Sequence, residues 1–295
     1  MKRALILNNA YMQLDSYLYQ SRRLAEELGA LGVATDVRRN DFFAVAIDDA
    51  GHIDLRLDKY DFCVYLDKDK YVSYLLQAKG LRLFNSAESV EACDDKMTTF
   101  VRLAEAGIAV PYTLPGLLCF DDGAAIPEAV YADVEARLGY PMVVKSSFGS
   151  LGKGVYKVDD RAALCDVLSR LKCQPHLFQR YVGTSCGRDV RVLVIGGEVV
   201  AAMLRRSGGD FRSNIELGGT ATPYRVPAAL ADECRRISEL LGLDYCGVDF
   251  LFGPDGFVLC EVNSNAFFGG LERTTGVNVA RCYAEYMCRT VYGDM

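Results

Sequence analysis

Residues 247–263 read GVDFLFGPDGFVLCEVN, which is two apolar runs on either side of a turn. The Pro-Asp-Gly of the turn suits a three-residue hairpin loop, in which a type I turn is followed by a glycine with a positive φ angle. In this register Asp249 lies opposite Glu261, and Asn263 shares the face of Glu261 because side chains alternate along a strand. A two-residue loop would instead place Cys260 opposite Asp249 and break the group. Two carboxylates and one amide suit a hard cation such as Mg²⁺, completed by phosphates and water.

The opposite face of this hairpin is apolar, with Val248, Phe250, Val258 and Val262. A strand with such a face usually packs on a core, and its polar face then meets either solvent or a cation. The simpler alternative is a solvated acidic strand face. We favour the cation site.

A glycine-rich segment, residues 146–154 (SSFGSLGKG), follows a predicted strand over 140–145 that ends in Lys145. Small residues let backbone N–H groups approach phosphate oxygens closely, and the adjacent lysines supply positive charge. The segment lacks the Gly-Lys-Ser/Thr ending of a Walker loop. A flexible surface hairpin is the alternative explanation for this composition.

Arginines gather further along the chain. Arg188 and Arg191 flank the start of one predicted strand, Arg205 ends the next, and Arg212 follows in a polar segment. The Gly-Gly pair at 196–197 between the two strands is a signal for a two-residue hairpin turn. Guanidinium groups bind phosphate or carboxylate through a bidentate fork. Surface arginines at strand ends are common, and they are the alternative reading.

The composition limits the function. The chain has 295 residues, 51% of them apolar, and a formal net charge of -6. This acidic balance disfavours broad nucleic-acid binding, which needs basic surface to neutralise phosphates. No apolar run is long enough to cross a bilayer, and the N-terminus lacks a full signal-peptide core, so we expect a cytoplasmic protein. The 11 cysteines form no C-x-x-C pair and are expected to be reduced, and His52 and His176 are too isolated to favour histidine-dependent catalysis.

Residues 1 to about 85 alternate predicted strands and helices, which favours a parallel sheet with crossover helices. The glycine fingerprint of dinucleotide-binding folds is absent from the residues that follow the first predicted strand, 4–7. This absence disfavours a nicotinamide dehydrogenase. Further predicted strands cover 33–37, 62–66, 81–84, 178–182, 190–195 and 198–204, and predicted helices begin near residues 15, 94, 229 and 278.

Together these segments resemble the ATP-grasp superfamily, most closely the RimK-type carboxylate–amine ligases. The resemblance implies an α/β and α+β protein, with an ATP-grasp fold preceded by a small Rossmann-like (pre-ATP-grasp) parallel-sheet domain. The implied parts are an N-terminal domain over 1–88, a central lid over 89–178 and a C-terminal subdomain with the metal site over 179–295. The segments that carry the resemblance, in the family's order, are 85–96, 107–111, 141–154, 179–182, 187–191, 209–214, 247–249, 261–264, 271–272 and 275–276.

The resemblance implies an ATP site. The residues that would contact ATP are Lys96, Lys145, Ser150, Gly152, Arg180, Tyr181, Val182, Asp189, Arg212, Ser213 and Asn214. Among them, the two lysines would bind phosphates, the backbone of 180–182 would hold adenine and Asp189 would bind the ribose. The residues that would hold two Mg²⁺ ions, with Mn²⁺ able to substitute, are Asp249, Glu261 and Asn263. Arg205 and Arg212 are the catalytic candidates, Arg205 as the group that steadies an acyl phosphate.

The family's reaction converts a carboxylate and ATP into an acyl phosphate, which an amine attacks to leave an amide, ADP and phosphate. Phosphoryl transfer depends on positioning and charge neutralisation more than on acid–base residues, so the scarcity of histidines is no obstacle. The implied partners are ATP, an amino acid as amine donor and a carboxylate acceptor, which is a small acid, a peptide or a protein terminus. A homo-oligomer is one option, because many relatives assemble. The alternatives are a small dipeptide or peptidoglycan-type ligase and a non-catalytic nucleotide-binding protein of the same fold.

Two departures from the family concern specificity. Arg180 stands where RimK-type enzymes usually carry Glu, but ATP binding should survive because the contact there is largely with the backbone. Residues 265–270 (NAFFGG) replace a small Ser-Pro-Gly stretch beside the metal site, so the two phenylalanines could face the acyl acceptor. A ribosomal-protein glutamate ligase is therefore one option among several. Replacement of Asp249 or Glu261 by alanine is expected to abolish turnover and to leave the fold intact.

Overall fold

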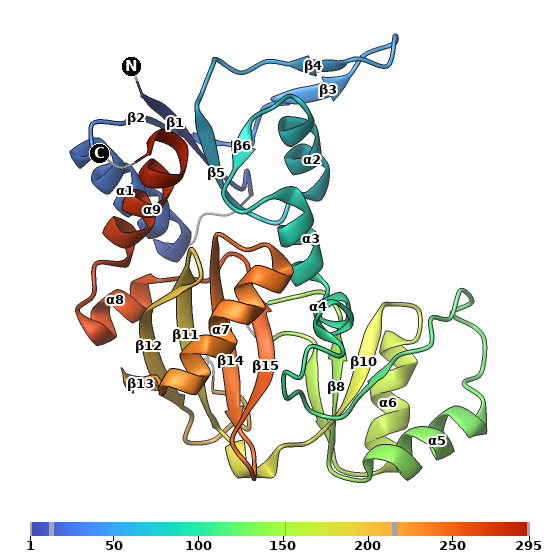
Figure 1. The fold of residues 1–295 in the computed structure, drawn as a ribbon. Coiled ribbons are helices and arrows are strands. Elements are labelled where there is room, and N and C mark those ends of the chain that lie inside the picture. Colours follow the sequence, from blue (N-terminus) through green and yellow to red (C-terminus); the bar gives the residue numbers. More distant parts are fainter. Residues whose placement is uncertain (1, 12–14, 151, 214–217, 294–295) are drawn as a thin grey trace.

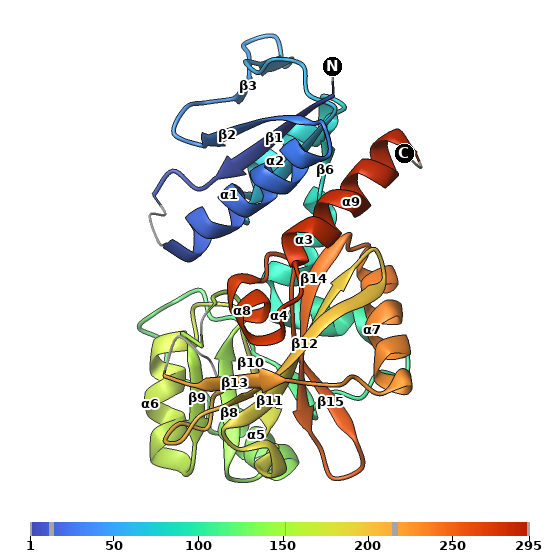
Figure 2. The ribbon, with the colours of Figure 1, turned by 90° about the vertical axis from the view of Figure 1, so that its left-hand side faces the viewer.

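The computed structural model describes residues 2–11, 15–150, 152–213 and 218–293, and the described strands form three main sheets and one small one. The three main sheets follow one another along the chain (Figure 1). In the turned view, the first sheet lies above the other two, which stand side by side (Figure 2). All 11 cysteines are unpaired, as expected. Among the described residues, no helix is long and apolar enough to span a membrane.

The N-terminal layer consists of β1 (Arg3–Asn8), α1 (Asp15–Ala30), β2 (Ala34–Arg39), β3 (Val45–Ile47), β4 (Ile53–Leu55), β5 (Phe62–Leu66), α2 (Lys70–Ala78) and β6 (Arg82–Leu83). Its main sheet is parallel, in the order β2-β1-β5-β6, which confirms the prediction from strand–helix alternation. The central strand β1 is buried on both faces. Ile6 shares a core with Leu24 and Leu28 of α1, whereas Leu5 shares a second core with Leu76 of α2.

The middle part consists of β7 (Thr113–Pro115), α5 (Glu128–Leu138), β8 (Met142–Ser146), β9 (Val155–Val158), α6 (Arg161–Leu171) and β10 (His176–Arg180). Its sheet is antiparallel, in the order β7-β10-β8-β9, and α6 packs on it through Leu164 and Leu168. Strand β10 begins earlier than the predicted strand over 178–182, because His176 and Leu177 are buried and already pair with β8. The predicted boundary between residues 178 and 179 therefore falls inside a strand.

The C-terminal part consists of η1 (Gly183–Ser185), β11 (Arg188–Ile195), β12 (Glu198–Arg206), β13 (Thr220–Pro223), α7 (Ala228–Leu241), β14 (Tyr245–Phe252), β15 (Phe257–Asn263), α8 (Gly269–Thr275) and α9 (Val279–Tyr292). Its antiparallel sheet has the order β13-β12-β11-β14-β15. One face packs on α7 and also on α3 (Ala87–Asp94) and α4 (Lys96–Leu103), through residues such as Cys93 and Phe100. These two helices thus belong to the core of this sheet and not to the central lid over 89–178.

Helix α9 connects the C-terminal part to the N-terminal layer. It lies beside α1 (Figure 1), and its buried Ala280, Ala284 and Met287 share one core with Leu24 and Leu28 of α1. Helix α9 therefore packs in the same core as β1 and α1.

The hairpin of β14 and β15 has the predicted pairing at its acidic face but a different turn. Asp249 lies opposite Glu261, as predicted. At the turn, the Gly253 N–H donates to the carbonyl of Gly256 at 2.7 Å, which is the arrangement of the two-residue loop. A bulge at Cys260 inserts one extra residue into β15 and restores the pairing beyond it. The prediction of a three-residue loop is therefore wrong, although the register that it was meant to produce is present.

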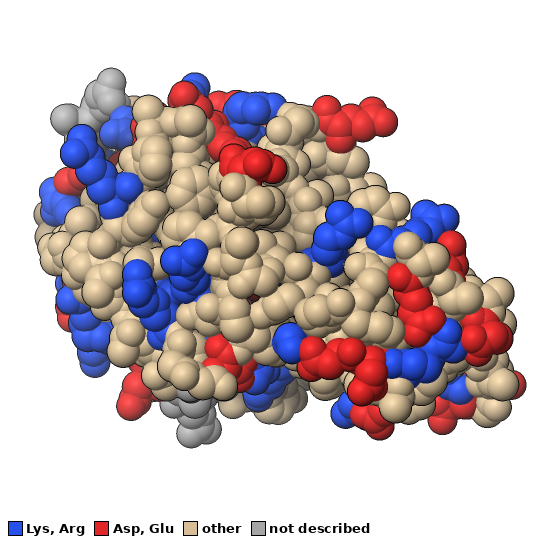
Figure 3. All heavy atoms as spheres, turned by 90° about the horizontal axis from the view of Figure 1, so that it is seen from below, with Lys and Arg blue, Asp and Glu red and all other residues tan. Residues whose placement is uncertain are grey.

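The surface carries charges of both signs. On the face seen from below, basic and acidic side chains are interspersed among uncharged residues (Figure 3). Nucleic-acid binding depends on basic side chains gathered on one face or along one helix. This view shows charges of both signs on one face.

A buried amide joins the N-terminal layer to the C-terminal sheet. Asn85, which follows β6, is 6% exposed. Its Nδ2 donates to the carbonyls of Tyr245 at 2.7 Å and Ser264 at 2.8 Å. Its Oδ1 accepts from the backbone N–H groups of Asp244 at 2.7 Å and Tyr245 at 3.0 Å. Both donors and both acceptor sites of the amide are therefore used.

Asn85→Ala is expected to lower the free energy of unfolding by about 3 kcal/mol, because it leaves four buried backbone groups without partners. Urea unfolding followed by circular dichroism measures the loss. The control is Gln174→Ala, which removes an amide exposed at the surface, and it should cost about 0.5 kcal/mol or less. Equal losses in the two variants would contradict the role given to Asn85.

Candidate active site

A cavity lies between the middle sheet and the C-terminal sheet, and we call it the central cavity. It brings together most of the predicted site residues: Lys96, Lys145, Ser150, Gly152, Arg180, Tyr181, Val182, Asp189, Arg205, Arg212, Ser213, Asp249 and Glu261 all line it. Asn263 does not line it, and Asn214 lies outside the described residues. Residues that are far apart in the sequence therefore meet around one space, as the resemblance implies.

The start of α4 positions Lys96. Asp95 caps this helix, and the Lys96 N–H donates to the carbonyl of Ser147 at 3.0 Å. The buried Lys96 Nζ donates to the carbonyl of Gly149 at 2.8 Å and lies 3.3 Å from Oε1 of Glu261. The ammonium group thus connects the glycine-rich loop to the acidic face of the hairpin.

Lys145 lies on β8 and is 8% exposed. Its Nζ lies 3.9 Å from Sγ of Cys260, and it forms no ion pair with any carboxylate of the described residues. Burial raises the pKa of the Cys260 thiol, so the sulfur is uncharged and does not neutralise the ammonium. A buried charge without an opposite charge is costly, so this position favours an anionic ligand.

The glycine-rich loop borders the cavity between β8 and β9. Gly149, Gly152 and Gly154 have φ angles of 124°, 73° and 71°, which residues with a side chain rarely adopt. Arg212 Nη1 donates to the carbonyl of Gly152 at 2.8 Å, and Asp210 holds the same guanidinium through Nη2 at 2.6 Å. Arg212 therefore fixes the loop from the side of the C-terminal sheet.

Residues 180–182 lead from the middle sheet into the C-terminal part. The Arg180 N–H donates to the carbonyl of Tyr112 at 2.9 Å, and the Arg180 guanidinium carbon lies 5.2 Å from the centroid of the Tyr112 ring. Of the backbone predicted to hold adenine, the amide of Arg180 is therefore already used. The amides of Tyr181 and Val182 donate no backbone hydrogen bond among the described residues.

Four charged side chains form a buried network across the central strands of the C-terminal sheet. Arg205 lies opposite Asp189 and donates to its two oxygens at 2.7 and 2.5 Å. Arg191 lies opposite Asp249 and donates to its two oxygens at 2.7 and 2.6 Å. Arg205 Nη2 also lies 3.0 Å from Oδ2 of Asp249, so the two pairs are joined. The network contains two carboxylates and two guanidinium groups, and its charges cancel.

The network determines the charge of Asp249. Burial alone would raise the pKa of its carboxyl group, but Arg191 and Arg205 hold it below the ordinary value. Burial would lower the pKa of Arg205, but the two carboxylates raise it above the ordinary value. Asp249 is therefore ionised, and as a metal ligand it would share its oxygens with two arginines.

The residues predicted to hold Mg²⁺ fit the ion to different degrees. The side chain of Glu261 is 28% exposed, lines the cavity and pairs with Lys96, so it is accessible to a cation. The Nδ2 of Asn263 is buried without a hydrogen-bond partner among the described residues, and a rotation of the amide would present its oxygen instead. Asp249 fits less well because arginines hold both of its oxygens. The part of the chain that the structure describes has no group of three or more His, Cys, Asp or Glu that could hold a metal ion.

The sequence alone does not identify Arg191 as the partner of Asp249. Opposite charges often lie across from each other on paired strands, but this rule predicts a pair only when the register of the strands is known. Arg191 and Asp249 are 58 residues apart, and the intervening chain holds a hairpin and a helix. The pairing of β11 with β14 is therefore visible only in the structure.

Asp249→Ala is expected to lower the free energy of unfolding by about 3–5 kcal/mol, because it leaves Arg191, whose side chain is 13% exposed, without its carboxylate partner. This result would correct the expectation that the fold stays intact when Asp249 is replaced. Urea unfolding measures the loss, with Glu198→Ala as the control. Glu198 is exposed on β12 and forms no ion pair with the described residues, so the control should lose about 0.5 kcal/mol or less. A similar loss in both variants would contradict the network as described.

The chain resembles known proteins in sequence and in fold. A family model described as RimK-like ATP-grasp domain matches residues 93–287. N-acetylaspartylglutamate synthase A from Homo sapiens is 36% identical over 226 residues, which cover 76% of this chain and 56% of that protein. Beta-citrylglutamate synthase B from Homo sapiens is 37% identical over 226 residues, which cover 76% of this chain and 57% of that protein. The chain thus spans little more than half the length of these relatives.

The fold is also that of solved structures. The ATP-grasp ligase PsnB, solved with a phosphomimetic variant of its minimal precursor, Mg and ADP, superposes with a TM-score of 0.68 at 20% sequence identity. The superposition covers 98% of this chain and 99% of that one. It confirms the predicted fold, including the N-terminal layer that precedes the family match. By sequence and by fold, the chain belongs to the RimK-like ATP-grasp family.

Proposed function

We propose that this protein is an ATP-dependent carboxylate–amine ligase. The observation that carries the proposal is the buried Lys145 ammonium, which faces the central cavity without a carboxylate partner among the described residues. The glycine-rich loop borders this cavity on one side and the acidic face of the hairpin on the other. Such a cavity suits a polyphosphate and its cation. The names of the two human relatives, both synthases, support the reaction class.

ATP would occupy the central cavity. Its phosphates would lie between Lys96 and Lys145, below Ser150 and Gly152 of the loop, with Arg212 and Ser213 close by. Its adenine would contact the backbone at Tyr181 and Val182. Asp189 remains the candidate for the ribose, although Arg205 already donates to both of its oxygens. The role predicted for Asn214 falls outside the described residues.

Mg²⁺ would bind at Glu261 and Asn263, with Asp249 as a third ligand that also pairs with arginines. When bound, the ion neutralises phosphate charge and so favours attack on the terminal phosphorus. Two ions, and substitution by Mn²⁺, are part of the proposal. A cytoplasmic location and a homo-oligomeric state also remain predictions.

The reaction has two steps. A carboxylate oxygen attacks the γ-phosphorus of ATP. The bond between this phosphorus and the oxygen that bridges it to the β-phosphorus breaks. ADP departs, and an acyl phosphate remains. The amine of an amino acid then attacks the acyl carbon, phosphate leaves, and the amine loses a proton to give the amide. Arg205 would steady the acyl phosphate, and Arg212 would hold the loop that excludes water. Because the names of both relatives contain glutamate, we propose glutamate as the first amine donor to test.

Phosphate release should require ATP, Mg²⁺, an amino acid and a carboxylic acid together. An assay with glutamate and a panel of small acids and peptides measures it, and mass spectrometry identifies the amide. Glu261→Gln should lower turnover at least a hundredfold while the thermal unfolding temperature stays within a few degrees. The exposed Glu198→Gln is the matched control and should keep full turnover. Magnesium-dependent nucleotide binding without any turnover would instead favour a non-catalytic binding protein.

Lys145→Met should weaken binding of a non-hydrolysable ATP analogue with Mg²⁺ by roughly 10- to 100-fold, because it removes a charge-assisted contact to phosphate. Stability should not fall, since the variant removes a buried charge that has no carboxylate partner among the described residues. Titration calorimetry and thermal unfolding measure the two effects, with the exposed Lys79→Met as control. Unchanged affinity for the analogue would refute the phosphate role of Lys145.

A further inference from the structure

A second cavity lies between α1 and α8, and we call it the α1–α8 cavity. It encloses about 540 Å³, which is enough for a small organic acid. Four guanidinium groups line it against a single carboxylate: Arg22, Arg191, Arg205, Arg273 and Asp15. The lining is therefore rich in arginine, in a protein whose net charge is -6.

Two of these arginines are already neutralised and two are not. Arg191 and Arg205 pair with Asp249 and Asp189 inside the buried network. Arg22 of α1 and Arg273 of α8 form no ion pair with any acidic residue that the structure describes, and both are exposed. Their guanidinium groups are thus available to a ligand that enters from solvent.

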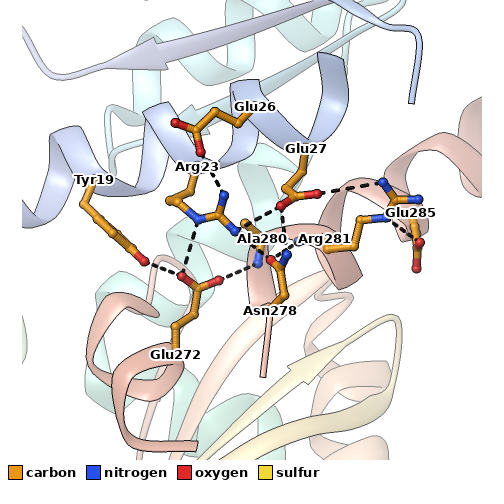
Figure 4. Close-up of polar contacts among 9 residues, drawn as sticks. All are labelled: Tyr19, Arg23, Glu26, Glu27, Glu272, Asn278, Ala280, Arg281 and Glu285. Carbon is orange, nitrogen blue, oxygen red and sulfur yellow. Dashed lines mark hydrogen bonds and ion pairs between the residues drawn. The ribbon is translucent and has the colours of Figure 1, made fainter. Parts of the chain in front are cut away.

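The acidic residues closest in sequence to Arg22 and Arg273 form hydrogen bonds and ion pairs with other side chains. They belong to a cluster that joins α1 to α8 and α9 (Figure 4). In it, the hydroxyl of Tyr19 donates to Glu272, Arg23 donates to Glu27 at 3.0 Å, and the Nε of Arg23 lies 3.6 Å from Glu272. Arg23 also donates to Glu26, and Arg281 donates to Glu285.

This cluster holds α1 and α8 in a fixed relation. Arg22 directly precedes Arg23, and Arg273 directly follows Glu272. Because the cluster holds their neighbours in sequence, Arg22 and Arg273 both lie at the edge of one cavity.

The α1–α8 cavity adjoins the central cavity through the buried network. Arg205 lines both cavities. Asp249 lines the central cavity and its partner Arg191 lines the α1–α8 cavity, so their ion pair forms part of the wall between them. A carboxylate at this wall would lie beside the place proposed for the terminal phosphate of ATP.

We propose that the α1–α8 cavity binds the acid that the ligase activates, and that this acid carries at least one carboxylate besides the one that reacts. The reacting carboxylate lies at the wall near Arg205, and Arg22 and Arg273 bind the other. A monocarboxylic acid leaves both guanidinium groups unpaired and binds more weakly. The assignment rests on the proposed ligase function for its chemistry, but the binding site itself can be tested without turnover.

Titration calorimetry in the presence of Mg²⁺ and a non-hydrolysable ATP analogue tests the site, with succinate, tricarballylate and citrate as probes and butanoate as the monocarboxylate. The wild type should bind at least one of the polycarboxylates tenfold or more tightly than butanoate. The double variant Arg22→Gln/Arg273→Gln should lose at least tenfold in that affinity, because charged hydrogen bonds are lost. In turnover, it should raise KM for the acid and leave kcat and KM for ATP unchanged.

Arg289→Gln is the matched control, because Arg289 is exposed on α9 and lines neither cavity. It should bind the acids as the wild type does, and thermal unfolding should show all variants folded. Equal binding by the double variant and the wild type would overturn the inference, and so would equal binding of butanoate and the polycarboxylates or no binding of any probe. A failure of the ligase proposal would appear separately, as an absence of phosphate release with every acid and amine.

Discussion

The buried network of Asp189, Arg205, Asp249 and Arg191 is the constraint on which the site depends. Its members come from β11, β12 and β14, and each bidentate pair joins residues that lie directly opposite each other. A slip of one residue in either pairing would turn the charged side chains to the other face of the sheet and leave charges buried without partners. The network therefore fixes the register of the three central strands. The same strands carry residues of both cavities, so the relative position of the two cavities is fixed as well.

Much of the site can be predicted from the sequence because it is encoded locally. Lys96 follows its helix cap, Lys145 lies one residue before the end of β8, and the glycines of the loop after it have the positive φ angles that such a loop requires. The register of the acidic hairpin is a different case. The turn is one residue shorter than predicted, and Asp249 lies opposite Glu261 only because a bulge at Cys260 compensates for it. No residue type in the segment predicts this bulge. The prediction of the pairing is confirmed, while the turn that supported it is wrong.

The remaining differences arise from contacts between distant segments. The predicted boundary at 178/179 cuts β10, since the buried His176 and Leu177 extend the strand toward the N-terminus. Helices α3 and α4 pack on the C-terminal sheet, although the chain reaches them before the middle sheet. The neutralisation of Asp249 by Arg191 likewise depends on how β11 pairs with β14. Local patterns cannot supply these facts, because tertiary packing decides them.

The neutrality of the network bears on how two anions could meet at its wall. Since its own charges cancel, it cannot offset the repulsion between a nucleotide phosphate and a carboxylate. The cations on either side of the network must therefore offset this repulsion. On the side proposed for the nucleotide, Lys96 and Lys145 are buried, so their charges are weakly screened. On the side proposed for the acid, Arg22 and Arg273 are exposed, so solvent weakens their field. The buried lysines are thus suited to favour the chemical step, whereas the exposed arginines are suited to select which acid reaches it.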